Sequence, residues 1–225
     1  MRTLWRVIRR RYLTATVFLA GFLVVTAISA GLPAHARSAL AAWASTSVAN
    51  LAHHPVAALA ASAFVAGGSA YAWPVLIALA VFGANRAVGS VRLALICAAA
   101  HVIGTGVSEG IVAYRVDAGL LPVSSRHLLD VGPSYVVVAA AVVALALGSW
   151  PARLAAALDL ALLIGPGQIF AGLTSLQVAA VGHLTAIAVA ACAAALIWRR
   201  RSGRAAAPPA GLSPGMNPCE NLRCE

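Results

Sequence analysis

Residues 130–147 read DVGPSYVVVAAAVVALAL, and within a few positions this stretch changes from polar to wholly apolar. Gly132, Pro133 and Ser134 mark the boundary, and the run beyond them contains no charged residue. A helix crosses the hydrocarbon core of a bilayer with about 20 apolar residues, and roughly 17 are sufficient. We therefore expect residues 131–148 to form a membrane-spanning helix with Ser134 near one end.

The whole chain has the same apolar character. Of its 225 residues, 61% are hydrophobic and 10% are charged, and the mean hydropathy is +0.89. Soluble domains are about 45–50% apolar and about 25% charged. The composition therefore predicts a multi-pass membrane protein, and the length suits one membrane domain.

Six apolar segments have lengths suited to crossing a bilayer, and they lie at residues 12–32, 72–88, 93–113, 131–148, 152–171 and 176–198. The first follows a basic leader and ends in Ala-His-Ala, which also fits a cleaved signal peptide. Its apolar run is longer than the usual signal core, which favours an uncleaved span. The fold class expected is an all-α membrane protein with six transmembrane helices.

Residues 33–71 are too polar for a clean span and too apolar for a solvated linker. They combine many alanines with His35, Arg37, Trp43 and Asn50. Tryptophan is enriched where a protein meets the headgroups of a membrane. We expect a long external loop that holds one or two short helices at the membrane interface, anchored by Trp43.

The formal net charge of +10 is concentrated at the two ends of the chain, and every basic residue is an arginine. Basic flanks of membrane spans stay in the cytoplasm. We therefore expect a plasma-membrane protein whose partner is the lipid bilayer, with no nucleic-acid partner. The expected parts are a basic cytoplasmic N-terminus at 1–11, the membrane domain at 12–198 and a disordered cytoplasmic tail at 199–225.

Polar side chains inside apolar segments are costly, so each is a candidate for function. They are Asn85, Arg86, His101, Glu109, Ser134, Asp159, Gln168 and His183. Each also has a structural interpretation: the first two cap the end of the second span, His101 and Glu109 bond neighbouring spans, and Asp159 pairs with Arg or His. The Cys219-x4-Cys224 spacing without a nearby histidine is a weak zinc pattern, and no phosphate-binding loop is present. Neither a metal nor a cofactor is expected.

Ser134 and His183 fall at similar depths in their expected spans, both near the outer face. A serine hydroxyl becomes a nucleophile when an adjacent base accepts its proton, and a neutral imidazole can be that base. The alternative is that the Ser134 hydroxyl caps a free N–H of its own helix. The two interpretations differ in whether the hydroxyl faces His183 or its own backbone.

Three short motifs in this chain resemble the rhomboid superfamily, in particular the divergent rhomboid-like integral membrane proteins of actinobacteria. GPSY at 132–135 stands where rhomboid proteases carry Gly-x-Ser-Gly, and His183 with Ala186 and Ala190 stands where they carry His-x-x-Gly-x-x-x-Gly. FGANRAVGSVR at 82–92 is similar to the Glu-x-x-x-Gly end of their second helix. The resemblance implies a six-helix rhomboid-like bundle in which Ser134 is the nucleophile and His183 the general base.

The chain departs from the family pattern around the oxyanion site. Tyr135 replaces the glycine after the serine, which puts a ring where a substrate carbonyl is expected to approach. Val138 stands where many members have a tyrosine that packs on the catalytic imidazole, and Asn85 replaces an acidic residue. The second-helix His and Asn donors correspond to Ser69 and Trp73. The candidates for oxyanion and supporting contacts are Gly132, Ser69, His53 and His54.

Two functions remain open at this point. The first is an intramembrane serine endopeptidase that cleaves transmembrane protein substrates near the outer face with a Ser-His dyad. The second is a non-proteolytic rhomboid-like protein, a pseudoprotease, that binds or escorts client helices. A small-solute transporter is a distant third, because neither an inverted repeat nor paired broken helices are evident. Substrate, client and oligomeric state are not readable from the sequence.

Overall fold

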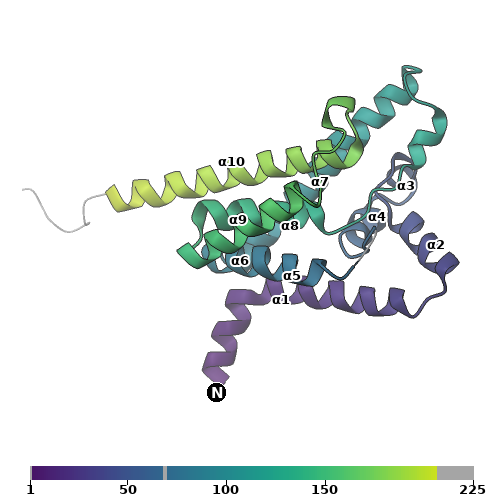
Figure 1. Cartoon of the computed structure of the whole chain (residues 1–225). Helices are drawn as coiled ribbons and strands as arrows, with labels where there is room; N and C mark the ends of the chain where they lie inside the picture. The colour runs from purple at the N-terminus through teal and green to yellow at the C-terminus, as the bar shows by residue number, and fades with distance from the viewer. Residues whose placement is uncertain (1, 68–69, 207–225) are drawn as a thin grey trace, which may run out of the picture.

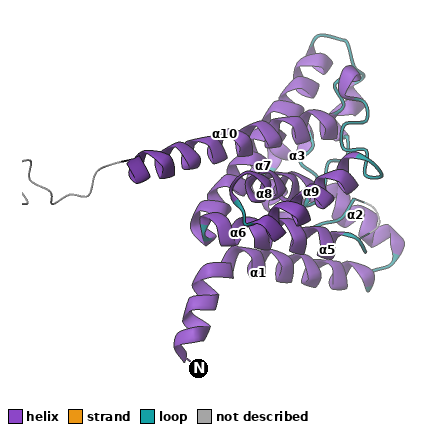
Figure 2. Cartoon of the chain, turned by 60° about the vertical axis from the view of Figure 1, so that its left-hand side comes forward, coloured by secondary structure: helices purple, strands orange, loops and turns teal. Residues whose placement is uncertain are grey.

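The computed structural model describes residues 2–67 and 70–206, and within them all regular secondary structure is helical (Figures 1 and 2). Its elements follow one another as α1 (Arg2–Ala30), α2 (Ala34–Ala44), α3 (Val48–His53), α4 (Pro55–Ser62), α5 (Trp73–Ile77), η1 (Ala78–Phe82), α6 (Gly83–Val88), α7 (Ser90–Asp117), η2 (Val123–His127), α8 (Ser134–Leu147), α9 (Trp150–Ile164), η3 (Leu173–Ser175) and α10 (Val178–Ala206).

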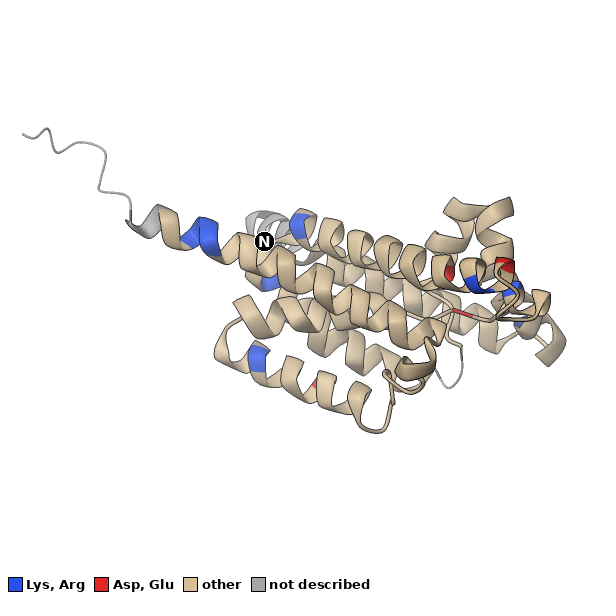
Figure 3. Cartoon of the chain, turned by 90° about the horizontal axis from the view of Figure 1, so that it is seen from above, with Lys and Arg blue, Asp and Glu red and all other residues tan. Residues whose placement is uncertain are grey.

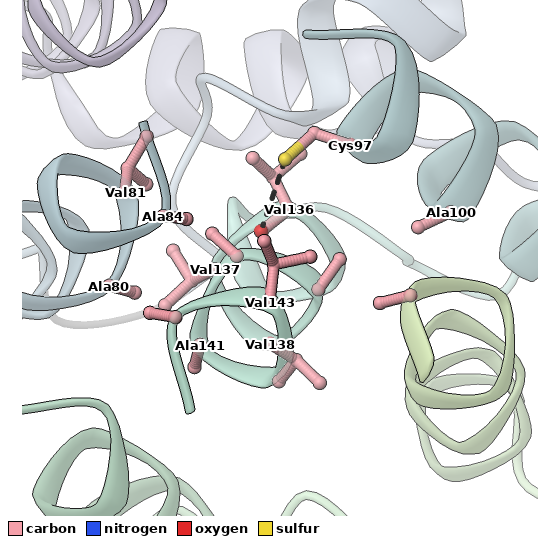
Figure 4. Packing of buried hydrophobic residues seen from close by; sticks show 14 of the residues in the cluster. Ala80, Val81, Ala84, Cys97, Ala100, Val136, Val137, Val138, Ala141 and Val143 are labelled. Carbon is pink, nitrogen blue, oxygen red and sulfur yellow. Dashed lines mark hydrogen bonds between the residues drawn. The ribbon is translucent and has the colours of Figure 1, made fainter. Parts of the chain in front are cut away.

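Helix α8 lies at the centre of the bundle and is buried along nearly its whole length. It packs against α6, α7, α9 and α10. Val137, Val138 and Val143 are fully buried among small residues of α6, α7 and η1 (Figure 4). Small side chains let helices approach closely in a membrane, and a helix that is apolar on all sides is suited to the core.

The span expected at 72–88 is a composite of α5, η1 and α6. The middle element, Ala78–Phe82, is a π-helical turn inside a helix that otherwise continues from Trp73 to Val88. Gly89 then takes a φ of +85° and starts the reversal into α7. A glycine is required there because side chains rarely adopt this backbone conformation.

The long loop at 33–71 contains three short helices, α2 to α4, rather than the one or two expected. Pro33 precedes the first, and Ser47 caps the second by accepting a bond from the N–H of Asn50. Pro55 opens the third at a position where its missing N–H has no helical partner. The loop is thus an ordered layer of helices in the described residues.

Three helices are long and apolar enough to cross a membrane: Tyr12–Gly31, Ser90–Asp117 and Val178–Gly203. Trp73–Val88 and Ser134–Leu147 are apolar but shorter. The all-helical membrane class is therefore confirmed, whereas the count of six spans is not. The expected span 152–171 is wrong at its end, because α9 stops at Ile164 before the helix breakers Gly165, Pro166 and Gly167.

The last helix is longer than expected. α10 continues to Ala206, so the prediction of a disordered tail does not hold for residues 199–206. Positions 207–225 of the expected tail, with Cys219 and Cys224, lie outside the described residues.

Most of the charges lie at the two ends of the bundle (Figure 3). Arginines gather at the end where α10 leaves the bundle, and the opposite end carries both signs. At the basic end Arg201 donates to the carbonyl of Ala87, and Arg153 donates to the carbonyls of Ala146 and Gly148. At the opposite end Arg126 and Asp117 form an ion pair.

Candidate functional site

Ser134 is the first residue of α8, and the turn before it depends on Gly132. Gly132 has a φ of +143°, which side chains rarely adopt. Its N–H donates to the carbonyl of Ser62 at 2.9 Å, so α4 fixes the turn. Pro133 then precedes the helix. Gly132 therefore lies beside Ser134 and shapes the backbone that presents it.

His183 lies in the first turns of α10, and its two ring nitrogens have different surroundings. Nδ1 is 3.1 Å from the carbonyl oxygen of Ile169. A carbonyl oxygen only accepts, so this contact places the proton on Nδ1 and leaves a lone pair on Nε2. Nε2 is buried and has no hydrogen-bond partner within the described residues. The imidazole is therefore held in the tautomer that accepts a proton at Nε2.

Ser134 and His183 line one cavity of about 580 Å³. Its walls come from α5, α8, the start of α10 and the connection between α9 and α10. Within the described part of the chain the Ser134 hydroxyl makes no hydrogen bond, and none joins it to His183. The capping interpretation of Ser134 therefore finds no bond to support it.

Tyr135 is buried beside Ser134. Its side chain is 3% exposed and does not line this cavity, although it lines a smaller recess together with Gly132 and Ser134. The ring lies between two histidines, with centroids 5.9 Å from His101 and 5.0 Å from His183. The contact with His183 is edge-on, at 88°. Tyr135 thus packs against the imidazole, as the family tyrosine at the position of Val138 is expected to do.

The hydroxyl of Tyr135 belongs to a polar group at the end of α8. It donates to Oδ2 of Asp130 at 3.0 Å. Thr46 also donates to this carboxylate, and Ser45 accepts a bond from the Asp130 N–H at 2.9 Å. Burial raises the pKa of Asp130, although the two hydroxyl donors act in the opposite direction. The group ties the loop between α2 and α3 to the segment that leads into Ser134.

The remaining predicted donors are not in the cavity. His54 lies 3.1 Å from the carbonyl of Trp43 and stacks on its ring, and His53 is exposed on α3. Neither lines the cavity with Ser134. Ser69 lies outside the described residues. The structure therefore brings Ser134, His183 and Gly132 into one region and leaves the two first-loop histidines outside it.

Other buried polar residues have structural contacts or none. His101 bonds the hydroxyl of Ser62 and the carbonyl of Leu59 on α4, a helix of the first loop, rather than a neighbouring span. Asn85 accepts the N–H of Ala15 at 3.0 Å. The carboxylates of Glu109 and Asp159 are buried without a hydrogen-bond partner in the described residues, and the ion pair expected for Asp159 is absent there.

Three polar side chains of the cavity escaped the sequence-based choice of site residues. Trp73, Gln168 and Gln177 line it together with Ser134 and His183. Each carries an N–H donor. Gln168 appeared only as a buried polar candidate, and Trp73 only as the residue at the position of the second-helix Asn. The signal that could have found the two glutamines is the Gly-Pro-Gly sequence at 165–167, which predicts a loop between α9 and α10.

The chain matches the family model described as rhomboid-like protein over residues 8–203. It belongs to the rhomboid-like family. No curated protein and no solved structure matches it. With its apolar, membrane-length helices, this rhomboid-like chain is a membrane protein. Among the described residues no three His, Cys, Asp or Glu side chains are grouped so that they could hold a metal ion.

Proposed function

We propose that this rhomboid-like protein is an intramembrane serine endopeptidase in which Ser134 is the nucleophile and His183 the general base. One observation carries the proposal. The Nε2 lone pair of His183 is buried and unpartnered, its tautomer is held by Ile169, and it lines the same cavity as the unbonded hydroxyl of Ser134. These are the parts a serine nucleophile needs.

The chemistry follows from these atoms. Ser134 Oγ attacks the carbonyl carbon of a substrate peptide bond while His183 Nε2 accepts the hydroxyl proton. The resulting imidazolium keeps its Nδ1–H bond to the Ile169 carbonyl and gives the proton from Nε2 to the leaving amine. Water then hydrolyses the ester on Ser134, with His183 again accepting a proton. The substrates proposed are transmembrane proteins, because the cavity lies in a membrane domain.

The tetrahedral intermediate needs hydrogen-bond donors for its oxyanion. The first N–H groups of α8 have no partner inside their helix. The N–H of Ser134 is the first candidate, because it belongs to the residue that would carry the intermediate. The indole of Trp73 and the amide of Gln177 line the same cavity and supply further candidates. One such donor contributes about 3 kcal/mol to a transition state.

A second function is favoured by a specific observation. No hydrogen bond joins Ser134 to His183 in the described structure, and the family's second-helix His and Asn are replaced. A pseudoprotease that binds or escorts client helices would keep the cavity and need no dyad. Catalytic hydrogen bonds are often loose without substrate, so the endopeptidase remains the proposal.

The test is labelling of the detergent-solubilised protein by a fluorophosphonate, which reacts with an activated serine. We expect wild type to be labelled, Ser134→Ala to be unlabelled, and His183→Gln to react at least about 100-fold more slowly, the usual contribution of a general base. Ser125→Ala and His54→Gln are the matched controls and should label like wild type. A folded wild type that takes no label contradicts the endopeptidase and leaves the pseudoprotease.

We also propose that the protein resides in the plasma membrane with both termini in the cytoplasm. Arginines at the basic end support this orientation, because basic flanks resist translocation. A C-terminal alkaline phosphatase fusion should be inactive and a C-terminal green fluorescent protein fusion fluorescent. The reverse pair of results would overturn the orientation.

A further inference from the structure

A groove lies between α7 and α10 at the basic end of the bundle. Its volume is about 260 Å³. Two arginines, Arg92 and Arg200, line it together with apolar side chains that include Leu95, Ile96, Leu196 and Ile197. None of these residues belongs to the cavity of Ser134 and His183.

The spacing of these residues separates the charges from the apolar floor. Leu95 and Ile96 follow Arg92 by three and four positions, so they lie on the same face of α7, one turn further into the bundle. On α10 the order is reversed, because Leu196 and Ile197 precede Arg200 by the same intervals. Arg92 stands near the start of its helix and Arg200 near the end of its own. Both guanidinium groups therefore lie at one depth and both apolar pairs lie deeper.

The two arginines have no binding partner in the described protein. Neither makes a hydrogen bond or an ion pair there, whereas Arg153 and Arg201 at the same end donate to backbone carbonyls. The apolar side chains of the groove are accessible from the membrane, since Leu95 is 65% exposed and Leu196 is 57% exposed. The groove therefore presents unpaired positive charge above an uncovered apolar surface.

We propose that this groove binds one anionic phospholipid of the leaflet at the basic end. Guanidinium groups bind phosphate through paired hydrogen bonds, which suits Arg92 and Arg200. An acyl chain then lies along Leu95 and Leu196. Basic recesses between membrane helices are suited to acidic headgroups. A client helix does not fit a recess of about 260 Å³, because a helix with side chains is about 10 Å across.

The experiment measures lipid binding to the full chain in detergent, by native mass spectrometry and by the shift of the unfolding temperature. Dioleoyl phosphatidylglycerol is the anionic probe, and dioleoyl phosphatidylcholine is the neutral comparison. The test variant is Arg92→Gln/Arg200→Gln. Its control is Arg86→Gln/Arg199→Gln, which removes the same charge from exposed residues of the same end that do not line the groove.

We expect phosphatidylglycerol to bind wild type and the control in preference to phosphatidylcholine and to raise their unfolding temperatures. In the test variant its apparent affinity should fall about tenfold or more. Equal losses in the two double variants would overturn the site and leave only general surface attraction. Inorganic phosphate that reproduces the shift, or a lack of preference for the anionic lipid, would also overturn it. The test variant should fold, because neither arginine contacts the protein through a hydrogen bond or ion pair.

Discussion

The hydroxyl of Tyr135 donates to Oδ2 of Asp130 across 3.0 Å, so the residue after Ser134 is bonded to the segment that precedes it. The same tyrosine ring meets the imidazole of His183 edge-on. One side chain therefore connects α8, its leading loop and His183.

Tyr135→Phe tests that connection. The change keeps the ring but leaves the half-buried Asp130 with one side-chain donor fewer, which should reduce the free energy of unfolding by about 1–3 kcal/mol. Thermal or denaturant unfolding in detergent measures the loss. Tyr114→Phe is the matched control, since Tyr114 is 70% exposed and should show no loss. Equal stability of the two variants would contradict the role of the Asp130 bond.

Asp130 predicts a pH dependence of stability. Burial raises its pKa above the ordinary 3.8, so the folded state holds this proton more tightly than the unfolded state. The stabilisation is full below the unfolded pKa and is lost as the pH rises through the folded pKa. The unfolding temperature of wild type relative to Asp130→Asn should therefore fall as the pH rises above 3.8. Parallel pH profiles of the two proteins would show that Asp130 does not titrate in this way.

A side chain added at Gly182 should have a large steric effect. An added methyl group there would lie 2.0 Å from the Tyr135 hydroxyl oxygen, whereas at Gly106 it would meet nothing within 4 Å. Gly182→Ala should displace the ring and cost about 1–3 kcal/mol of unfolding free energy. Gly106→Ala should be neutral or slightly stabilising in its helix. The result to be measured is the difference between their unfolding temperatures, and no difference would contradict the packing.

The side chain of Asn85 attaches α1 to the bundle through a hydrogen bond. Its Oδ1 accepts the buried N–H of Ala15, and its amide donates to Ser90 at 3.1 Å. Asn85→Ala should cost about 1–3 kcal/mol, because a buried donor loses its acceptor. Arg86→Ala, the exposed neighbour, should change the stability by less than about 0.5 kcal/mol. Faster hydrogen exchange across α1 in the Asn85 variant would locate the effect, and unchanged exchange would argue against it.

Two nearby glycines of α7 differ in their helix contacts. An added methyl at Gly104 would lie 3.1 Å from the carbonyl oxygen of Gly182. Gly106 makes no such contact, because that position faces open space. Side chains two positions apart on a helix point in directions about 200° apart around its axis. Neighbouring small residues therefore face different partners. Composition predicts close packing without showing which glycine makes it.

The sequence by itself determined the helical membrane class, because apolar length and helix-breaking residues act locally. The end of α6 before Gly89 and the start of α8 at Ser134 follow from such signals. Only the tertiary structure placed the Ile169 carbonyl on His183 Nδ1, turned Tyr135 away from the cavity and left His53 and His54 outside it. These positions depend on how separate helices rotate and pack against one another. Apolar periodicity shows which residues are buried in a helix, but not which residues of another helix they meet.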